Sequence, residues 1–255
     1  PEATMAVLTA DHFIGNEVVF REAVAAALTA AEDDCLVTLG ITPEFPSTEY
    51  GYIQQGQVLR EIAGHKVLEA LRFVEKPDLE RAKEMLQSGD YSWNSGMFIW
   101  KVNVILDEFS RQMPELFDQI TCIGRAVNTH AYAVTLGETW PKIRKQTIDY
   151  GIMEGARKVV VIPVAMQWTD VGNWNSLKAL LPEDARGNTI RGDAFLLDCD
   201  GSLIVGAQKL IAGVGLEDLI VVDTPDALLV CRKDRVQDVR KIADTLKAAG
   251  RLDLI

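Results

Sequence analysis

Short apolar runs alternate with stretches of helical periodicity along most of this chain, and that alternation restricts the fold more than any other feature. Residues 6–9 and 35–39 are mainly apolar runs with one threonine each, typical of strands buried within a sheet. Between them, residues 16–31 repeat apolar positions at helical spacing, which predicts a helix packed on the sheet. Strand-then-helix order favours an α/β fold with a parallel or mixed sheet.

The same alternation continues to about residue 180. Further strands are predicted at 67–74 and 159–164, and further helices at 79–87, 102–111 and 116–126. Pro114 separates the last two helices, because proline interrupts a helix interior. Residues 41–52 contain two prolines and are predicted to form an irregular loop.

From about Gly187 the pattern becomes all-β. Short apolar runs, broken by Gly, Asp and Pro, are found at 194–197, 203–205, 209–212, 219–222 and 228–230. Residues 234–249 predict a terminal amphipathic helix with Asp234 as its N-cap, and Gly213 is interpreted as a turn. We therefore predict two domains, residues 1–184 and residues 185–255.

Composition limits the class of protein. A net charge of −11 argues against a nucleic-acid partner, whose phosphates would be repelled. No apolar run approaches the roughly 20 residues that span a membrane, and no signal peptide is visible. The four cysteines form no CxxC pair, as expected of free thiols in a reducing compartment. These features predict a cytoplasmic protein with no membrane or nucleic-acid partner.

Two acids follow predicted strands at positions suited to a ligand. Asp11 comes after the strand at 6–9, and Asp170 lies in the glycine-containing stretch WTDVGNW that follows the strand at 159–164. Carboxyl ends of strands are where α/β sheets bind ligands. Two bare carboxylates about 4 Å apart repel by roughly 4 kcal/mol, and a divalent cation such as Mg²⁺ reverses that sign. The alternative is that each acid only caps the turn or helix after it.

Three further segments carry polar groups at predicted element ends. Glu75 and Lys76 precede Pro77, which favours an extended backbone at Lys76 and side chains on opposite faces of the strand. Asn94 precedes a second apolar run, and Asp149 lies in the first turn of a helix expected to be capped by Thr147. A solvated strand end at Lys76 and a turn role for Asn94 are the alternatives.

Six segments together resemble the mannose-1-phosphate guanylyltransferases, a branch of the sugar-1-phosphate nucleotidyltransferases. They are ADH (10–12), YGYI (50–53), FVEKP (73–77), WNSGMF (93–98), TIDYGIME (147–154) and WTDVGNW (168–174). FVEKP alone is shared by many nucleotidyltransferases, whereas all six in this order are strongly specific. The resemblance runs from the first residues to about residue 180, and more loosely to the C-terminus.

The resemblance implies a Rossmann-like nucleotidyltransferase sheet followed by a small left-handed β-helix-like domain and a terminal helix. It implies a reaction in which GTP and mannose 1-phosphate give GDP-mannose and pyrophosphate by in-line transfer, with Mg²⁺ as cofactor. The C-terminal domain is expected to join two subunits in a homodimer. The loop at 41–52 is expected to cover the sugar.

Residue roles are implied in the same way. Asp11 and Asp170 correspond to the metal ligands, and Lys76 to the cation on the sugar phosphate, so these three are the expected catalytic residues. The remaining expected substrate contacts are Glu75 and Asn94 at sugar hydroxyls, Gly51 with its backbone against the hexose, and Asp149.

The chain also departs from the family pattern. The glycine-rich loop that cradles the triphosphate is absent, so we expect that the N-terminal nucleotide-binding lobe is missing and that the chain as written is inactive. Gly155 stands where Lys often follows Glu154, and Lys158 is a candidate substitute cation. Two other hypotheses stay open: a nucleotidyltransferase for another sugar 1-phosphate or nucleotide, and a non-catalytic truncated paralogue that binds sugar nucleotide.

Overall fold

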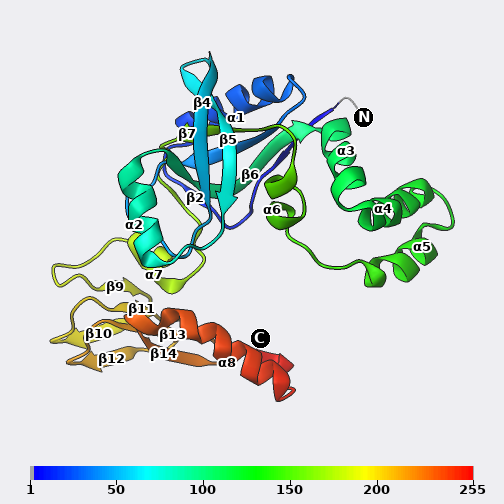
Figure 1. Ribbon diagram of the computed structural model, residues 1–255. Coiled ribbons are helices and arrows are strands. Elements are labelled where there is room, and N and C mark those ends of the chain that lie inside the picture. Colours follow the sequence, from blue (N-terminus) through cyan, green and yellow to red (C-terminus); the bar gives the residue numbers. More distant parts are fainter. Residues whose placement is uncertain (1–2, 255) are drawn as a thin grey trace. The chain divides into compact units, whose positions relative to one another are not determined.

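A computed structural model describes residues 3–254 (Figure 1). The chain divides into two compact units, the first ending at Trp168 and the second beginning at Thr169. The predicted domain boundary after residue 184 stays a prediction.

The first unit is built on a mixed six-stranded sheet, which confirms the predicted α/β class. Its strand order is β1-β6-β3-β7-β5-β4, and β4 also pairs with β6. The strands are β1 (Thr4–Val7), β3 (Leu36–Ile41), β4 (Tyr52–Ile62), β5 (His65–Val74), β6 (Tyr91–Lys101) and β7 (Val159–Val164). Strands β3 and β7 run parallel and the other pairs are antiparallel. Short strands β2 (Phe13–Ile14) and β8 (Trp168–Thr169) form a separate pair.

In this unit, helices form at the four ranges where the periodicity predicts them, and further short helices form where it gave no prediction. Helix α1 (Glu17–Ala31) begins at Asn16, whose side chain accepts a hydrogen bond from the Val19 N–H at 3.2 Å. Helix α2 (Leu79–Ser88) ends at Gly89, which adopts a left-handed φ of 73°. The remaining helices of this unit are α3 (Val102–Gln112), α4 (Pro114–Ala126), α5 (Tyr132–Thr139), η1 (Trp140–Lys142), α6 (Ile148–Gly151) and η2 (Met153–Gly155).

Strand alternation divides the core of this unit into two layers. Val37 and Leu39 of β3 pack with the alanine-rich face of α1 in one cluster. Leu36, on the opposite face of the same strand, packs with Ile105 of α3 and with Ile152 in another. Because successive side chains of a strand point to opposite faces, one sheet supports both layers.

Strand β1 differs from its prediction. It lies at an end of the sheet order, and Met5 and Val7 are 41% and 38% exposed, so the prediction of a buried strand is wrong. Among the described residues only β6 pairs with it. Apolar character alone did not distinguish an edge strand from a central one.

The second unit stacks short parallel strands, as the change of pattern near Gly187 predicts. Strand β11 (Leu203–Val205) pairs in parallel with β9 (Thr189–Arg191) and with β13 (Leu219–Asp223). Strands β10 (Ala194–Leu197) and β12 (Ile211–Val214) pair in parallel in a second sheet, and β14 (Leu228–Arg232) lies antiparallel to β13. This unit also contains α7 (Trp174–Ala179), η3 (Lys233–Asp238), α8 (Val239–Ala248) and η4 (Leu252–Leu254).

Two local predictions in this unit are wrong. Gly213 lies inside β12, and a Cβ there would come within 2.7 Å of Leu216 Cδ1, so a close approach requires the glycine. Asp234 does not cap the terminal helix: it lies within η3 and pairs with Arg232, while α8 begins five residues later.

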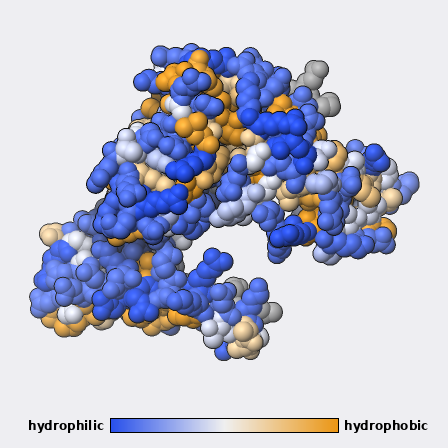
Figure 2. Space-filling view, viewed as in Figure 1, coloured by the Kyte–Doolittle hydropathy of each residue, from blue (hydrophilic) through white to orange (hydrophobic). Residues whose placement is uncertain are grey.

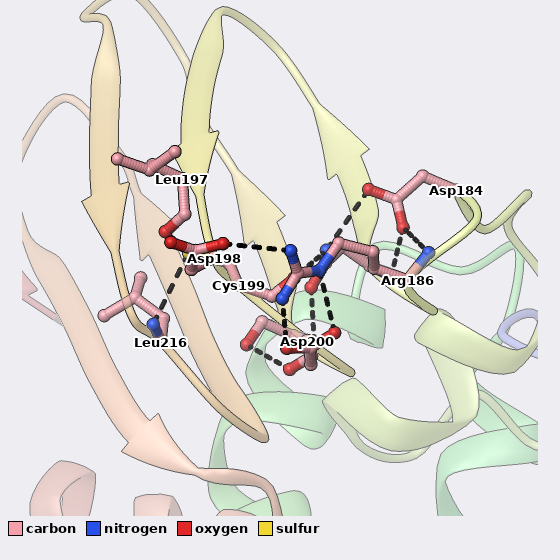
Figure 3. Close-up of polar contacts among 9 residues, drawn as sticks. Asp184, Arg186, Leu197, Asp198, Cys199, Asp200 and Leu216 are labelled. Carbon is pink, nitrogen blue, oxygen red and sulfur yellow. Dashed lines mark hydrogen bonds and ion pairs between the residues drawn. The ribbon is translucent and has the colours of Figure 1, made fainter.

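A buried asparagine and an exposed arginine organise the first turns of the second unit. Figure 3 shows Arg186 beside Asp198 and Asp200. Arg186 pairs with Asp198 at 3.2 Å and with Asp200 at 2.7 Å, and these hydrogen bonds raise the pKa of the guanidinium despite its partial desolvation. Asn188 is 2% exposed and donates to the Cys199 carbonyl at 2.7 Å while its Oδ1 accepts from the Ser202 N–H at 3.0 Å.

The surface is mainly hydrophilic, with local apolar areas (Figure 2). In the first unit, hydrophobic atoms gather over the β4–β5 hairpin, where Val58, Leu59 and Leu71 are exposed. In the second unit they gather over β10 and β12, where Phe195 and Val214 are each 71% exposed. Within residues 3–254, each helix is too short or too polar to cross a bilayer.

Candidate active site

Three neighbouring strands of the first unit bring the predicted sugar-side residues together. Antiparallel pairing aligns Tyr52 of β4 with Val74 of β5 and with Trp93 of β6. One position further in the same direction lie Gly51 just before β4, Glu75 just after β5 and Asn94 within β6. A backbone hydrogen bond of 2.7 Å from Asn94 N to Gly51 O joins β6 to the start of β4 here. We call the place where Gly51, Glu75 and Asn94 meet the corner.

Gly51 is required by its neighbours. A Cβ at this position would lie 2.5 Å from Glu75 Oε2 and 3.4 Å from Asn94 Cβ. The space that a side chain would occupy is filled by the Glu75 carboxylate, so any larger residue would displace that group.

Glu75 and Lys76 approach each other, contrary to the prediction of side chains on opposite faces. Lys76 has a φ of +44°, in the left-handed region, so the extended backbone predicted from Pro77 is also wrong. This conformation lets the Lys76 ammonium form an ion pair with the Glu75 carboxylate. The pair holds the two side chains of FVEKP at the same corner.

The Lys76 ammonium is held in its charged form. Its hydrogen bond with Glu75 raises the pKa of Lys76 above its ordinary value, and burial opposes this only in part. Tyr150 and Asp149 also raise it, which places the start of α6 within electrostatic reach of the same corner. The arrangement offers one cation surrounded by hydrogen-bonding acids, suitable for a phosphate ester that carries hydroxyl groups.

Asn94 links the corner to α6. Its Nδ2 donates to Asp149 Oδ1 at 2.7 Å, and its Oδ1 accepts from the Gly96 N–H at 3.2 Å. The turn contact at Gly96 is the alternative role anticipated for Asn94, and here it coexists with the contact to Asp149. One amide proton and one lone pair of Asn94 remain for a ligand. Thr147 precedes α6 as predicted, but its side chain makes no capping hydrogen bond.

The loop before β4 is anchored by aromatic packing. Tyr52 Oη accepts from the Ser47 N–H at 2.9 Å and donates to the Ser47 carbonyl at 3.0 Å. Phe45 and Tyr50 each pack on Trp93, with ring centroids 4.8 Å and 5.0 Å apart. Residues 42–51 therefore form the predicted irregular loop between β3 and β4, fastened beside Gly51.

Asp11 lies in an exposed turn after β1, at the end of that strand. The next residue, His12, accepts a hydrogen bond at 3.0 Å from the indole N–H of Trp168, and the two rings meet edge to face at 5.0 Å. This contact fastens the Asp11 turn to Trp168, the last residue of the first unit.

Asp170 belongs to the second unit. Its Oδ1 accepts from the Gly172 N–H at 3.3 Å, and Val171 between them has a φ of +39°. The turn role considered for this acid is thus present. Carboxylate oxygens on exposed or half-buried turns are the ligands that Mg²⁺ prefers, so both acids fit the ion by chemistry. Their joint coordination of a metal stays a prediction.

Two glycines within residues 147–155 lie close to neighbouring side chains, and one of them is the departure at Gly155. A Cβ on Gly151 would lie 2.7 Å from Met113 Sδ, and one on Gly155 would lie 2.3 Å from Gln112 Oε1. Lys158 is not a substitute cation: its ammonium donates to the Asp33 carbonyl, and its backbone precedes β7, at the end opposite the carboxyl terminus of that strand. The sequence offered no signal for the hydrogen bond from Gln112 Nε2 to the Ile152 carbonyl, which joins residues 40 positions apart.

The first 186 residues of the chain match a known family. Residues 1–186 match the family described as Nucleotidyl transferase. The chain belongs to the nucleotidyl transferase family. Residues 192–246 of this nucleotidyl transferase match a second family, described as MannoseP isomerase/GMP-like beta-helix domain, which confirms the predicted β-helix-like C-terminal module.

Similar proteins carry names from sugar-phosphate metabolism. A mannose-1-phosphate guanylyltransferase from Klebsiella pneumoniae is 38% identical over 95% of this chain and 52% of its own length. The xanthan biosynthesis protein XanB of Xanthomonas campestris pv. campestris strain B100 is 40% identical over 96% of this chain and 51% of its own length. The nucleotidyl transferase chain thus spans about half the length of the curated relatives it matches.

A solved structure supports the same assignment. The crystal structure of a mannose-1-phosphate geranyltransferase from Thermus thermophilus superposes with a TM-score of 0.81 at 32% identity. That match covers 96% of this nucleotidyl transferase and 70% of the other chain. The α/β sheet and the β-helix-like module therefore occur together in a similar solved protein.

Proposed function

We propose that this chain contributes the sugar-phosphate side of a mannose-1-phosphate guanylyltransferase, which converts GTP and mannose 1-phosphate to GDP-mannose and pyrophosphate. The observation that carries the proposal is the corner formed by Gly51, Glu75, Lys76, Asn94 and Asp149, which lie far apart in the sequence and meet at one end of the sheet. The names of the relatives support the choice of sugar and nucleotide.

Each group has a defined task in this proposal. Lys76 neutralises the phosphate of mannose 1-phosphate, and Glu75, Asn94 and Asp149 bind its hydroxyl groups. The sugar phosphate oxygen then attacks the α-phosphorus of GTP in line, and pyrophosphate leaves. Such a reaction asks the protein mainly for positioning and charge neutralisation.

Asp11 and Asp170 are the residues that would hold Mg²⁺. When bound, the ion supplies charge neutralisation to the phosphates of the nucleotide. We further propose that the protein acts in the cytoplasm, as a homodimer joined through the β-helix-like module.

The test is a turnover assay of the full-length protein that carries this sequence. Pyrophosphate release is measured with GTP, CTP, UTP and ATP, each paired with mannose 1-phosphate and glucose 1-phosphate, with and without Mg²⁺. We expect release that is fastest with GTP and mannose 1-phosphate and is lost on Mg²⁺ removal. Preference for another pair would favour a nucleotidyltransferase of different specificity. No turnover, together with tight binding of sugar nucleotide, would favour a non-catalytic paralogue.

A further inference from the structure

Glu108 of α3 is a buried acid that the proposed chemistry does not use. It is 7% exposed, whereas the neighbouring Asp107 faces solvent. A buried carboxylate is costly unless hydrogen bonds and a counter-charge satisfy it. Its burial at the end of a surface helix therefore calls for a specific set of partners.

Those partners are complete. Glu108 Oε2 accepts from Arg111, at 3.2 Å from Nε and at a shorter distance from Nη2, and from Gln112 Nε2 at 2.7 Å. Glu108 Oε1 accepts from the Arg157 backbone N–H at 3.2 Å. Two donors come from the same helix, and the third comes from the chain that follows η2.

The same side chains continue to the segment after α6. Arg111 Nη2 donates to the Gly155 carbonyl at 2.5 Å, and Gln112 Nε2 donates to the Ile152 carbonyl at 3.0 Å. Gly155 leaves room for Gln112, since a Cβ would meet its Oε1. The segment from Ile152 to Arg157 is thus fastened to α3 at three backbone groups. All three bonds involve Glu108 or a side chain that it holds, and we call these three bonds the clamp.

This segment fixes the short helix that carries Asp149. Helix α6 has four residues, too few to be stable without tertiary contacts. Its last turn is closed by Ile152 N donating to Ile148 O at 2.9 Å. Ile152 is fully buried, so a shift of its carbonyl would move the turn and the Asp149 carboxylate that accepts from Asn94.

We propose that Glu108 is a positioning residue that sets Asp149 and Asn94 for a sugar phosphate, by ordering Arg111 and Gln112 against residues 152–157. The inference rests on the proposed function for its ligand. The α3 helix is thus part of the support of the sugar site, although Glu108 itself touches neither Asp149 nor Asn94.

The experiment measures binding and order, not turnover. Glu108→Gln keeps the shape of the side chain but replaces one carboxylate oxygen with an amide N–H₂, so the side chain can no longer accept from all three donors. We expect its dissociation constant for mannose 1-phosphate, measured by calorimetry in the full-length protein, to rise at least fivefold, while that for GTP changes less than twofold. Amide hydrogen exchange of residues 148–157 should accelerate in the absence of ligand. Asp107→Asn is the matched control and should change neither.

Gln112→Ala is a milder second variant, in case Glu108→Gln folds poorly. It removes the bond to Ile152 and should weaken mannose 1-phosphate binding by at least twofold with the same selectivity over GTP. Unchanged exchange in both variants would overturn the clamp, and equal weakening of both ligands would overturn its link to the sugar. If the wild-type protein binds neither ligand, the proposed function is refuted, and the role of Glu108 in sugar binding is refuted with it. The exchange data would still show whether Glu108 orders residues 148–157.

Discussion

The side-chain amide of Asn94 donates a 2.7 Å hydrogen bond to Asp149, a residue 55 positions later in the chain. The bond joins the middle of β6 to the first turn of α6, and it holds Asn94 Oδ1 toward the Gly96 N–H. It therefore fixes which atoms of both side chains can meet a sugar hydroxyl.

Replacing Asp149 by alanine should weaken substrate binding. A hydrogen bond to a charged group contributes on the order of 1.5–3 kcal/mol, which corresponds to a roughly 10- to 100-fold increase in KM for mannose 1-phosphate. Asp149→Asn keeps an acceptor for Asn94 and should lose less. Steady-state kinetics with each substrate varied in turn would measure both. A KM for mannose 1-phosphate that is unchanged in Asp149→Ala would remove Asp149 from the sugar site.

Gly51→Ala should displace the Glu75 carboxylate, because the new Cβ would lie 2.5 Å from Oε2. Loss of the ion pair with Lys76 should then raise KM for mannose 1-phosphate by about tenfold, equivalent to about 1.4 kcal/mol. Thermal stability should fall by less than about 3 kcal/mol, the usual range for overpacking.

Gly124→Ala is the control for this change, since a Cβ on Gly124, in α4, meets nothing within 4 Å. It should leave KM unaltered and stabilise the helix by up to about 1 kcal/mol. If Gly51→Ala and Gly124→Ala have the same KM for mannose 1-phosphate, the close contact between Gly51 and Glu75 does not affect substrate binding.

Asp170→Asn tests the metal role. If Asp170 and Asp11 bind Mg²⁺ together, the variant should lose about 100-fold or more in turnover, because about 2.7 kcal/mol of transition-state stabilisation gives that factor. The melting temperature should barely change, because the amide oxygen can still accept from the Gly172 N–H. Raising the Mg²⁺ concentration should recover part of the rate. Wild-type turnover in Asp170→Asn would end the assignment.

Much of the first unit was predictable because its strands and helices have regular periods. Helix α1, with its Asn16 cap, and strand β7 agree with the apolar pattern to within about two residues. Strand β4 was missed: its QQGQ stretch lacks the apolar character of a strand, although β5 and β6 supply the partners that hold it. Pairing with neighbours decided its structure against its local preference.

The site shows the same division. The family resemblance pointed to Gly51, Glu75, Lys76, Asn94 and Asp149. The register of β4, β5 and β6 brings the first four together, and a hydrogen bond from Asn94 adds Asp149. The positive φ of Lys76 was not predictable, because residues before proline usually adopt extended backbone. Nor was the burial of Glu108, which lies in the polar stretch LDEFSRQ and resembles a solvated helix face until α3 packs on residues 152–157.

In the second unit, the buried Asn188 should contribute more to the free energy of unfolding than the exposed Arg186. Asn188 is 2% exposed and its side chain binds the Cys199 carbonyl and the Ser202 N–H. Asn188→Ala leaves these groups unpaired and should cost on the order of 2–3 kcal/mol. Arg186→Ala removes only exposed ion pairs and should cost less than about 1 kcal/mol. Urea unfolding of both variants would compare them, and a larger loss for Arg186→Ala would contradict this assignment.

Glu108 should make the stability of the first unit depend on acid pH. Burial raises the pKa of Glu108, but hydrogen bonds from Arg111, the Arg157 N–H and Gln112 outweigh it and hold the pKa below the ordinary value of 4.5. The folded state therefore favours the ionised carboxylate more than the unfolded chain does. Its stabilising contribution is complete above about pH 4.5 and is lost as the pH falls through the lower folded-state pKa.

Melting temperatures of wild type and Glu108→Gln, measured from pH 3 to pH 7, check this dependence. At pH 7 the variant should be less stable by about 1–3 kcal/mol, because the amide cannot accept from all three donors. The difference should shrink toward pH 3, where the wild-type carboxylate also becomes protonated and loses the same bonds. Asp107→Asn, at an exposed position on the same helix, should follow the wild-type curve throughout. A constant gap between wild type and Glu108→Gln across this range would show that the charge of Glu108 does not stabilise the clamp.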